Sequence, residues 1–171
     1  MSHSTLYLMF GYPGAGKTTT AKIIHDLTGA VHLSSDELRL KMFPEPQFTP
    51  EEHDKLYKAL DDQTRQLLSA GKSVIYDANL NRRQHRQEKY DICQQTGAKP
   101  VLVWIQTPSD IAKQRATHVE RQHLVPKAES PENMFDRIAG IIESPTTDET
   151  PVKLDGTLIT LDYVKQMLKL A

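Results

Sequence analysis

Residues 5–18 read TLYLMFGYPGAGKT, and this stretch decides how the chain folds. Its first part, Thr5–Phe10, is a mostly apolar run without alternation, which is typical of a buried strand. Its second part, Gly11–Thr18, matches the pattern G-x-x-x-x-G-K-[ST] at every fixed position. A helix is expected to follow over about residues 17–27. The order strand, glycine-rich loop, helix is the context that this pattern requires.

Each fixed position of the loop has a chemical role. The glycines let the backbone wrap closely around phosphates, and the following helix directs the positive end of its dipole at them. We expect Lys17 to reach the β- and γ-phosphates of ATP or GTP and the Thr18 hydroxyl to bind Mg²⁺. The alternative is a chance glycine turn. The residues expected to bind the nucleotide are Gly11, Tyr12, Pro13, Gly14, Ala15, Gly16, Lys17, Thr18 and Thr19, with Arg115 from a later segment.

The rest of the chain alternates between strand and helix signals. Four more short apolar strands are expected, at residues 31–33, 74–76, 100–105 and 152–154. Helices are expected from a Thr49 cap to Gly71, over residues 82–95 before Gly97, after Thr107-Pro108, after Ser130-Pro131 and from about residue 161. This order predicts a three-layer α/β P-loop fold, with a parallel five-stranded sheet and helices on both faces. The loop then lies at the carboxyl end of the first strand.

Length and composition indicate one globular domain over residues 1–171, with a lid at about 115–130. Cys93 is the one cysteine, which excludes a disulfide within the chain and favours a reducing cytoplasm. Neither a signal-peptide pattern nor an apolar run long enough to cross a membrane is expected. The net charge of −1 argues against broad nonspecific binding of nucleic acid, although a short nucleic acid end in a local basic cleft stays open.

A group of polar residues follows the strand at 31–33, in the sequence SSDELR at residues 34–39. Several sheet orders place this strand next to the P-loop strand, so that a carboxylate at its end faces the γ-phosphate. Asp36 is then a candidate general base that accepts the proton of an attacking hydroxyl, and Arg39 is a candidate to hold the acceptor. The spacing equally favours an alternative in which Ser35 or Asp36 only caps a short helix.

The segment VIYD at residues 74–77 resembles a Walker B strand, in which Asp77 orients Mg²⁺ through a water ligand. The alternative for Asp77 is a turn or helix-capping role. Asn79 follows at the same end of the sheet and is a candidate to hydrogen-bond a hydroxyl-bearing acceptor. Arg83 is a second such candidate, although a solvated helix surface is the competing interpretation for Arg82 and Arg83 alike.

A third cluster consists of basic side chains between two predicted helices, namely Lys113, Arg115, His118, Arg121, His123 and Lys127. Guanidinium groups stabilise the negative charge on the γ-phosphate oxygens during transfer. An irregular segment between helices suits a lid that closes over the nucleotide. Arg115 and Arg121 therefore join Lys17 and Asp36 as predicted catalytic residues. A plain charged helix face is the alternative.

These motifs occur in a fixed order: a G-x-P-G-A-G-K-T loop, S-x-D-x-x-R, D-x-N-x-x-x-R, and a basic segment that ends at Val125-Pro126. The order resembles that of small P-loop kinases of the polynucleotide-kinase and zeta-toxin type, over roughly residues 5–142. The resemblance implies that Asp36 is the general base and that Arg39 positions the acceptor. No phosphatase domain follows, unlike in some two-domain polynucleotide kinases.

The resemblance also gives roles to residues further along the chain. Asp77 and Asn79 match the acidic and polar positions after the third strand. Arg115 and Arg121 match lid arginines that contact the phosphates of ATP.

We therefore expect an ATP-dependent kinase, with Mg²⁺ as cofactor, that transfers the γ-phosphate to a hydroxyl of a small metabolite, a nucleoside or a polynucleotide 5′ end. Two alternatives stay open. An ATPase or nucleotide switch would have no acceptor site and would make Asp36 expendable. A toxin-like kinase of nucleotide sugars would be supported by a partner antitoxin.

Overall fold

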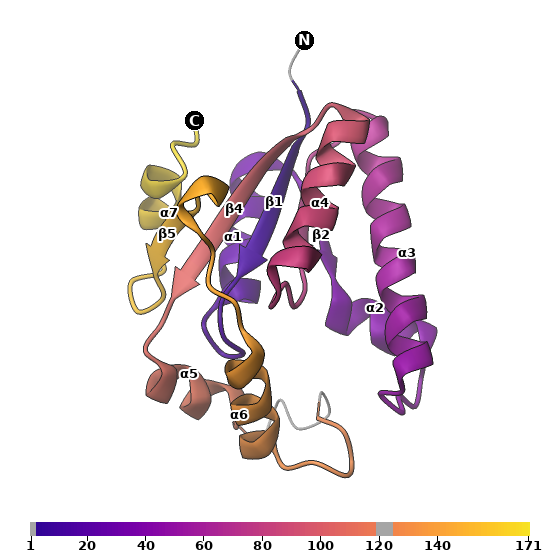
Figure 1. The fold of residues 1–171 in the computed structure, drawn as a ribbon. Coiled ribbons are helices and arrows are strands. Elements are labelled where there is room, and N and C mark those ends of the chain that lie inside the picture. The colour runs from indigo at the N-terminus through magenta and orange to yellow at the C-terminus, as the bar shows by residue number, and fades with distance from the viewer. Residues whose placement is uncertain (1–2, 119–124) are drawn as a thin grey trace.

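The computed structural model describes residues 3–118 and 125–171 as three layers, with a sheet between two layers of helices (Figure 1). The strands are β1 (Thr5–Phe10), β2 (Val31–Ser34), β3 (Val74–Asp77), β4 (Lys99–Gln106) and β5 (Val152–Asp155). The helices are α1 (Lys17–Thr28), α2 (Ser35–Met42), α3 (Pro50–Ser69), α4 (Arg83–Thr96), α5 (Ser109–Ala116), α6 (Pro131–Ile141) and α7 (Leu161–Met167), with a short 3₁₀ turn, η2, at Thr147–Glu149. Every strand pairing is parallel, which confirms the predicted fold class.

The core lies on both faces of the sheet, and β1 shows why. Alternate residues of a strand point to opposite faces. Leu6 and Leu8 of β1 join the apolar cluster beneath α3 and α4, whereas Tyr7 and Met9 join the cluster beneath α1 and α7. A central parallel strand covered on both faces needs an apolar run without alternation, as residues 5–10 provide.

The helix ends follow the predicted capping signals in most places. The Thr49 side chain accepts a hydrogen bond from the backbone of Glu52 at the start of α3, and Ser130 caps α6 in the same way. The predicted cap at Thr107 is wrong, because α5 begins at Ser109 after Pro108. The Thr107 hydroxyl donates instead to the carbonyl of Ala15, 2.8 Å away. This hydrogen bond connects the residue after β4 to the P-loop.

The sheet order is β2-β3-β1-β4-β5, which corrects one expectation. β2 does not adjoin the P-loop strand, because β3 lies between them. Ser34 at the end of β2 is paired in register with Asp77 at the end of β3, and α2 starts directly after Ser34. Ser34 is the residue that caps this helix, accepting from the backbone of Glu37, so the proposed caps at Ser35 and Asp36 are not used.

α5 and α6 stand together at the carboxyl end of the sheet, beyond the P-loop (Figure 1). Their contact is apolar, with Ala112 and Ala116 of α5 packed against Phe135 of α6. The ring of Tyr12 in the P-loop lies 5.9 Å from the ring of Phe135. The helices on either side of the predicted lid, α5 and α6, therefore pack against the loop. Among residues 3–118 and 125–171, no helix is long and apolar enough to cross a membrane.

Candidate active site

The P-loop lies between β1 and α1, and helix α5 packs directly against it. Gly14 has a φ of +79°, in the left-handed region, and a Cβ there would lie 2.2 Å from the carbonyl oxygen of Ala112. Only glycine satisfies both the backbone conformation and this close approach. The fixed shape of the loop thus depends on its packing against α5 as well as on its own sequence.

Lys17 is at the first position of α1, and its side chain returns across the loop. Its Nζ donates to the carbonyl of Gly11 at 2.8 Å and to that of Tyr12 at 2.9 Å. These contacts hold the ammonium at the place where the loop and the start of α1 favour negative charge.

Asp77 and Thr18 lie together at the end of β3 and the start of α1. The Thr18 hydroxyl donates to Asp77 Oδ2 at 2.8 Å, and only 6% of Asp77 is exposed. A hydroxyl and a carboxylate next to a phosphate-binding loop are hard oxygen donors of the kind that Mg²⁺ prefers, so this pair fits the expected cation. The imidazole of His32 in β2 also reaches Asp77, with Nε2 2.9 Å from the same Oδ2. Sequence reasoning did not single out His32.

A cavity of about 830 Å³ connects the P-loop to the space between α3 and α4. Thr18 and Asp77 line it at the P-loop side, and Asp36 of α2 lines the same cavity. Arg39 and Asn79 line it as well. Its volume is within the range of pockets that bind small organic ligands.

Arg39 is held on the cavity wall by neighbours from the segment before α3 and from α3 itself. Its guanidinium carbon lies 4.9 Å from the centre of the Phe48 ring, and Nη1 is 3.6 Å from Glu52 Oε2. Among the described residues, this buried Nη1 has no hydrogen-bond partner. The arrangement fixes the guanidinium on the cavity wall that Asp36 also lines.

Besides Asp54 and Asp61, the α3 side of the cavity carries Tyr57 and His53, which are neutral near pH 7. Burial raises the pKa of Tyr57 to about 12, and the negative charge of Asp36 acts in the same direction. Burial lowers the pKa of His53, and the positive charge of Arg39 lowers it further. Tyr57 and His53 therefore contribute hydrogen-bonding groups to this wall without adding net charge at neutral pH.

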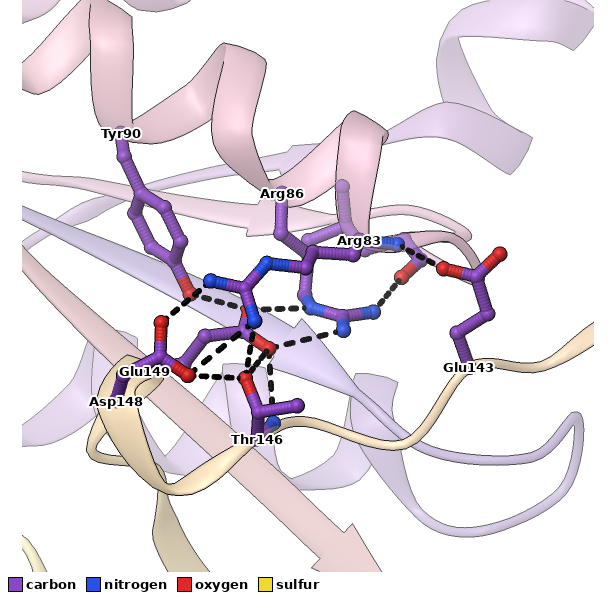
Figure 2. A network of polar contacts seen from close by, with 8 residues as sticks. Arg83, Arg86, Tyr90, Glu143, Thr146, Asp148 and Glu149 are labelled. Atoms are coloured by element: carbon purple, nitrogen blue, oxygen red, sulfur yellow. Dashed lines mark hydrogen bonds and ion pairs between the residues drawn. The ribbon is translucent and has the colours of Figure 1, made fainter.

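Arg83 lies away from the cavity, contrary to its predicted role in acceptor binding. Its guanidinium pairs with Asp148 and donates to Thr146, both in the segment after α6 (Figure 2). Arg82, one residue earlier, lines the cavity instead. The physical reason is that α4 begins at Arg83. The side chain at this first helical position faces the segment after α6 that contains Thr146 and Asp148.

Of the two predicted lid arginines, the structure describes Arg115. Arg115 Nη1 donates to the carbonyl of Gly156 at 3.2 Å, in the turn after β5, and so lies beside the P-loop on the α7 side. Arg121 and His123 lie outside the described residues. Arg137 of α6, which sequence reasoning did not select, lines the cavity and pairs with Glu129 at 2.9 Å.

Comparisons with known proteins agree with this architecture. The family model described as an AAA domain matches residues 6–145. A search of curated proteins finds no match. Among solved structures, the chain is similar to a putative kinase from Chloroflexus aurantiacus, with a TM-score of 0.77, 15% identity and 98% of each chain covered. It is also similar to a sugar kinase from Janibacter sp. HTCC2649, with a TM-score of 0.69, 19% identity, and 99% of this chain and 96% of that chain covered.

A third solved structure is the Mycobacterium tuberculosis APS kinase CysC in complex with AMPPNP and APS. Its TM-score is 0.72 at 17% identity, with 99% of this chain and 96% of that chain covered. At such identities the likeness shows the fold, whereas the family match covers most of this chain. The chain therefore belongs to this AAA-domain family and has the fold of small P-loop kinases.

Proposed function

We propose that this protein is an ATP-dependent kinase that transfers the γ-phosphate to a hydroxyl of an acceptor. The observation that carries the proposal is the single cavity that joins the P-loop and the Thr18–Asp77 pair to Asp36 and Arg39. A phosphoryl donor site and a carboxylate with a neighbouring guanidinium thus share one space. Phosphoryl transfer requires such proximity, because the attacking oxygen must lie in line with the γ-phosphate.

The P-loop side of the cavity binds the donor. The backbone N–H groups of the loop and the amino end of α1 hold the phosphates, and Lys17 exchanges the carbonyls of Gly11 and Tyr12 for phosphate oxygens. Thr18 and Asp77 would hold Mg²⁺, which neutralises the negative charge of the phosphates when it is bound. Arg115 is proposed to contribute a guanidinium from the lid.

The α2 side of the cavity binds the acceptor. Arg39 and Asn79 orient the acceptor, and Asp36 accepts the proton of its hydroxyl. A bond forms between the acceptor oxygen and the γ-phosphorus while the bond from that phosphorus to the β–γ bridging oxygen breaks. The products are a phosphate ester, ADP and a protonated Asp36, which returns its proton to solvent.

A nucleotide switch or plain ATPase fits the cavity less well. Hydrolysis needs room for one water, whereas the cavity continues past Asp36 to the facing sides of α3 and α4 and is lined there by Tyr57, His85 and Lys89. The cavity as a whole, at about 830 Å³, is within the range of pockets that bind small organic molecules, far more than one water needs.

The test is a screen of acceptors with ATP labelled in the γ-position. The panel contains neutral sugars, amino sugars, nucleosides, adenylyl compounds and oligonucleotides with a 5′-hydroxyl, each with Mg²⁺. We expect label in one class of acceptor at a rate well above its release as inorganic phosphate. Release of inorganic phosphate alone across the whole panel would contradict the kinase proposal and favour an ATPase.

A further inference from the structure

Asp77 receives two hydrogen bonds on one carboxylate oxygen. Thr18 Oγ1 lies 2.8 Å from Oδ2 and His32 Nε2 lies 2.9 Å from the same atom. The side chain of His32 is 15% exposed and that of Asp77 is 5% exposed. An ionised carboxylate only accepts hydrogen bonds, so both partners donate, and His32 carries its proton on Nε2. Among the described residues, both hydrogen bonds of Asp77 end on Oδ2, so Oδ1 keeps its acceptor capacity.

The register of the sheet explains why these three residues meet. In the parallel pair β2–β3, His32 lies opposite Ile75 and Ser34 lies opposite Asp77. Side chains two residues apart share a face of the sheet, so His32 and Asp77 point to the same face. That face is the one covered by α1, because Ile75 packs in the same apolar cluster as residues of α1. Thr18 is in the first turn of α1, and the three side chains therefore converge from three elements.

We propose that His32 is a positioning residue for the divalent cation site at Thr18 and Asp77. It holds the Asp77 carboxylate in one orientation, with Oδ2 directed at Thr18 and His32 and Oδ1 left to act toward the cation and its water ligands. The inference rests on the proposed function, since it assumes that this site binds Mg²⁺. Groups that orient a metal-binding carboxylate typically change metal affinity or activity by about 10- to 100-fold when they are removed.

A purely structural role is the competing explanation. β2 is an edge strand, and a buried hydrogen bond from it to β3 also stabilises the sheet. The two explanations differ in what they predict for the cation. A structural role changes the melting temperature alone, whereas a positioning role changes the Mg²⁺ concentration needed for tight nucleotide binding.

The experiment measures binding of AMPPNP by calorimetry over a series of MgCl₂ concentrations and in EDTA. His32→Leu removes the donor and keeps an apolar side chain, while His32→Gln places an amide N–H near the position of Nε2. For His32→Leu we expect the half-saturating Mg²⁺ concentration to rise by about tenfold or more. The affinity in EDTA should stay within about twofold. His32→Gln should restore most of the Mg²⁺ response.

His25 provides a matched control. Its Nδ1 donates to the backbone carbonyl of Ala30 at 2.8 Å, a hydrogen bond of nearly the same length at the far end of α1. His25→Leu should lower the melting temperature and leave the Mg²⁺ response as in the wild type. Thermal unfolding of all three variants shows whether each one folds.

The outcomes separate the inference from the function on which it rests. An unchanged Mg²⁺ response in a folded His32→Leu variant overturns the positioning role, even if the melting temperature falls. An equal loss of AMPPNP affinity with and without Mg²⁺ also overturns it, because His32 would then act on the P-loop. If wild-type binding of AMPPNP does not respond to Mg²⁺ at all, the cation site of the proposed function is wrong. The positioning role of His32 is then wrong as well, because it depends on that site.

Discussion

Of the carboxylates that line the cavity, Asp77 and Asp36 have surroundings that suit them to different tasks. Asp77 is buried at the end of β3 and receives hydrogen bonds from Thr18 and His32. Asp36 is in the first turn of α2, exposed and open to the cavity. A carboxylate held by donors suits binding a cation, whereas one that faces an acceptor suits taking up a proton. In the proposed function, environment therefore separates the metal role from the base role, although both residues are aspartates.

We expect nucleotide binding to depend more on Lys17 than on any other side chain of the P-loop. Lys17→Ala removes the one charged side chain of the P-loop pattern and should weaken Mg-AMPPNP binding by at least about tenfold, the scale of a lost charge-assisted hydrogen bond. Calorimetry measures the loss. Lys22→Ala, on the exposed side of the same helix, is the control and should bind normally. Equal affinity in Lys17→Ala and the wild type would refute the assignment of the loop.

Arg115 of α5 is in the predicted lid, and the prediction for it concerns the catalytic rate. Arg115→Ala should lower kcat by at least about 10²-fold, the scale of a lost contact to transition-state charge, with a smaller effect on nucleotide affinity. Gln114→Ala, an exposed neighbour on α5, is the control. Steady-state kinetics with an identified acceptor decide the point. Normal turnover in Arg115→Ala would make its hydrogen bond to Gly156 a structural contact only.

At the scale of elements, α4 is joined to the segment after α6 by two ion pairs at different depths (Figure 2). Arg86 and Glu149 are almost fully buried and lie 2.7 Å apart, whereas Arg83 and Asp148 are exposed. Arg86 also donates to the carbonyl of Leu80 at 2.9 Å, in the loop that lines the cavity. The segment after α6 and the cavity wall are thus connected through the buried Arg86.

This buried pair makes stability depend on pH. Burial alone would raise the pKa of Glu149, but hydrogen bonds from Arg86, the backbone of Thr146 and Tyr90 outweigh it and lower the pKa to about 2, below the ordinary value of 4.5. A depressed pKa stabilises the fold above the unfolded value, and this contribution is lost as pH falls from about 4.5 toward 2.

Glu149→Gln should therefore cost on the order of 3 kcal/mol of unfolding free energy at pH 7, as expected when one partner of a buried pair is removed. Urea unfolding at several pH values measures it, and the difference from the wild type should shrink below pH 4.5. Asp148→Asn, in the exposed pair, should lose far less. A difference that is the same at pH 7 and at pH 3 would contradict this explanation.

At the scale of the whole molecule, the sequence predicted the layers and strands well because their signals are local. The apolar run at residues 5–10, the glycine loop and the cap at Thr49 each need only a few neighbouring residues to be recognised. The sheet order could not be predicted in this way, because the position of β2 depends on how its crossovers pack. His32 was missed for that reason, since its contact with Asp77 requires β2 and β3 to be neighbours.

The orientations of Arg82 and Arg83 could not be predicted from the sequence for a related reason. The partner of Arg83 is Asp148, 65 residues later in the chain, and the start of α4 decides which arginine faces it. A shift of one residue at a helix start turns the side chain by about 100°. Local propensity does not fix a helix end to that accuracy.

The central claim is that Asp36 takes the proton of an acceptor hydroxyl in a cavity shared with the P-loop. Asp36→Asn keeps the size of the side chain but removes its capacity to accept that proton at neutral pH. The most direct measurement is the transfer rate of the γ-phosphate label to the acceptor found in the screen, with Mg-AMPPNP affinity measured on the same protein. We predict that Asp36→Asn binds the nucleotide as the wild type does and loses about 10²–10⁴-fold in transfer. Transfer at a near-normal rate in this variant would contradict the claim.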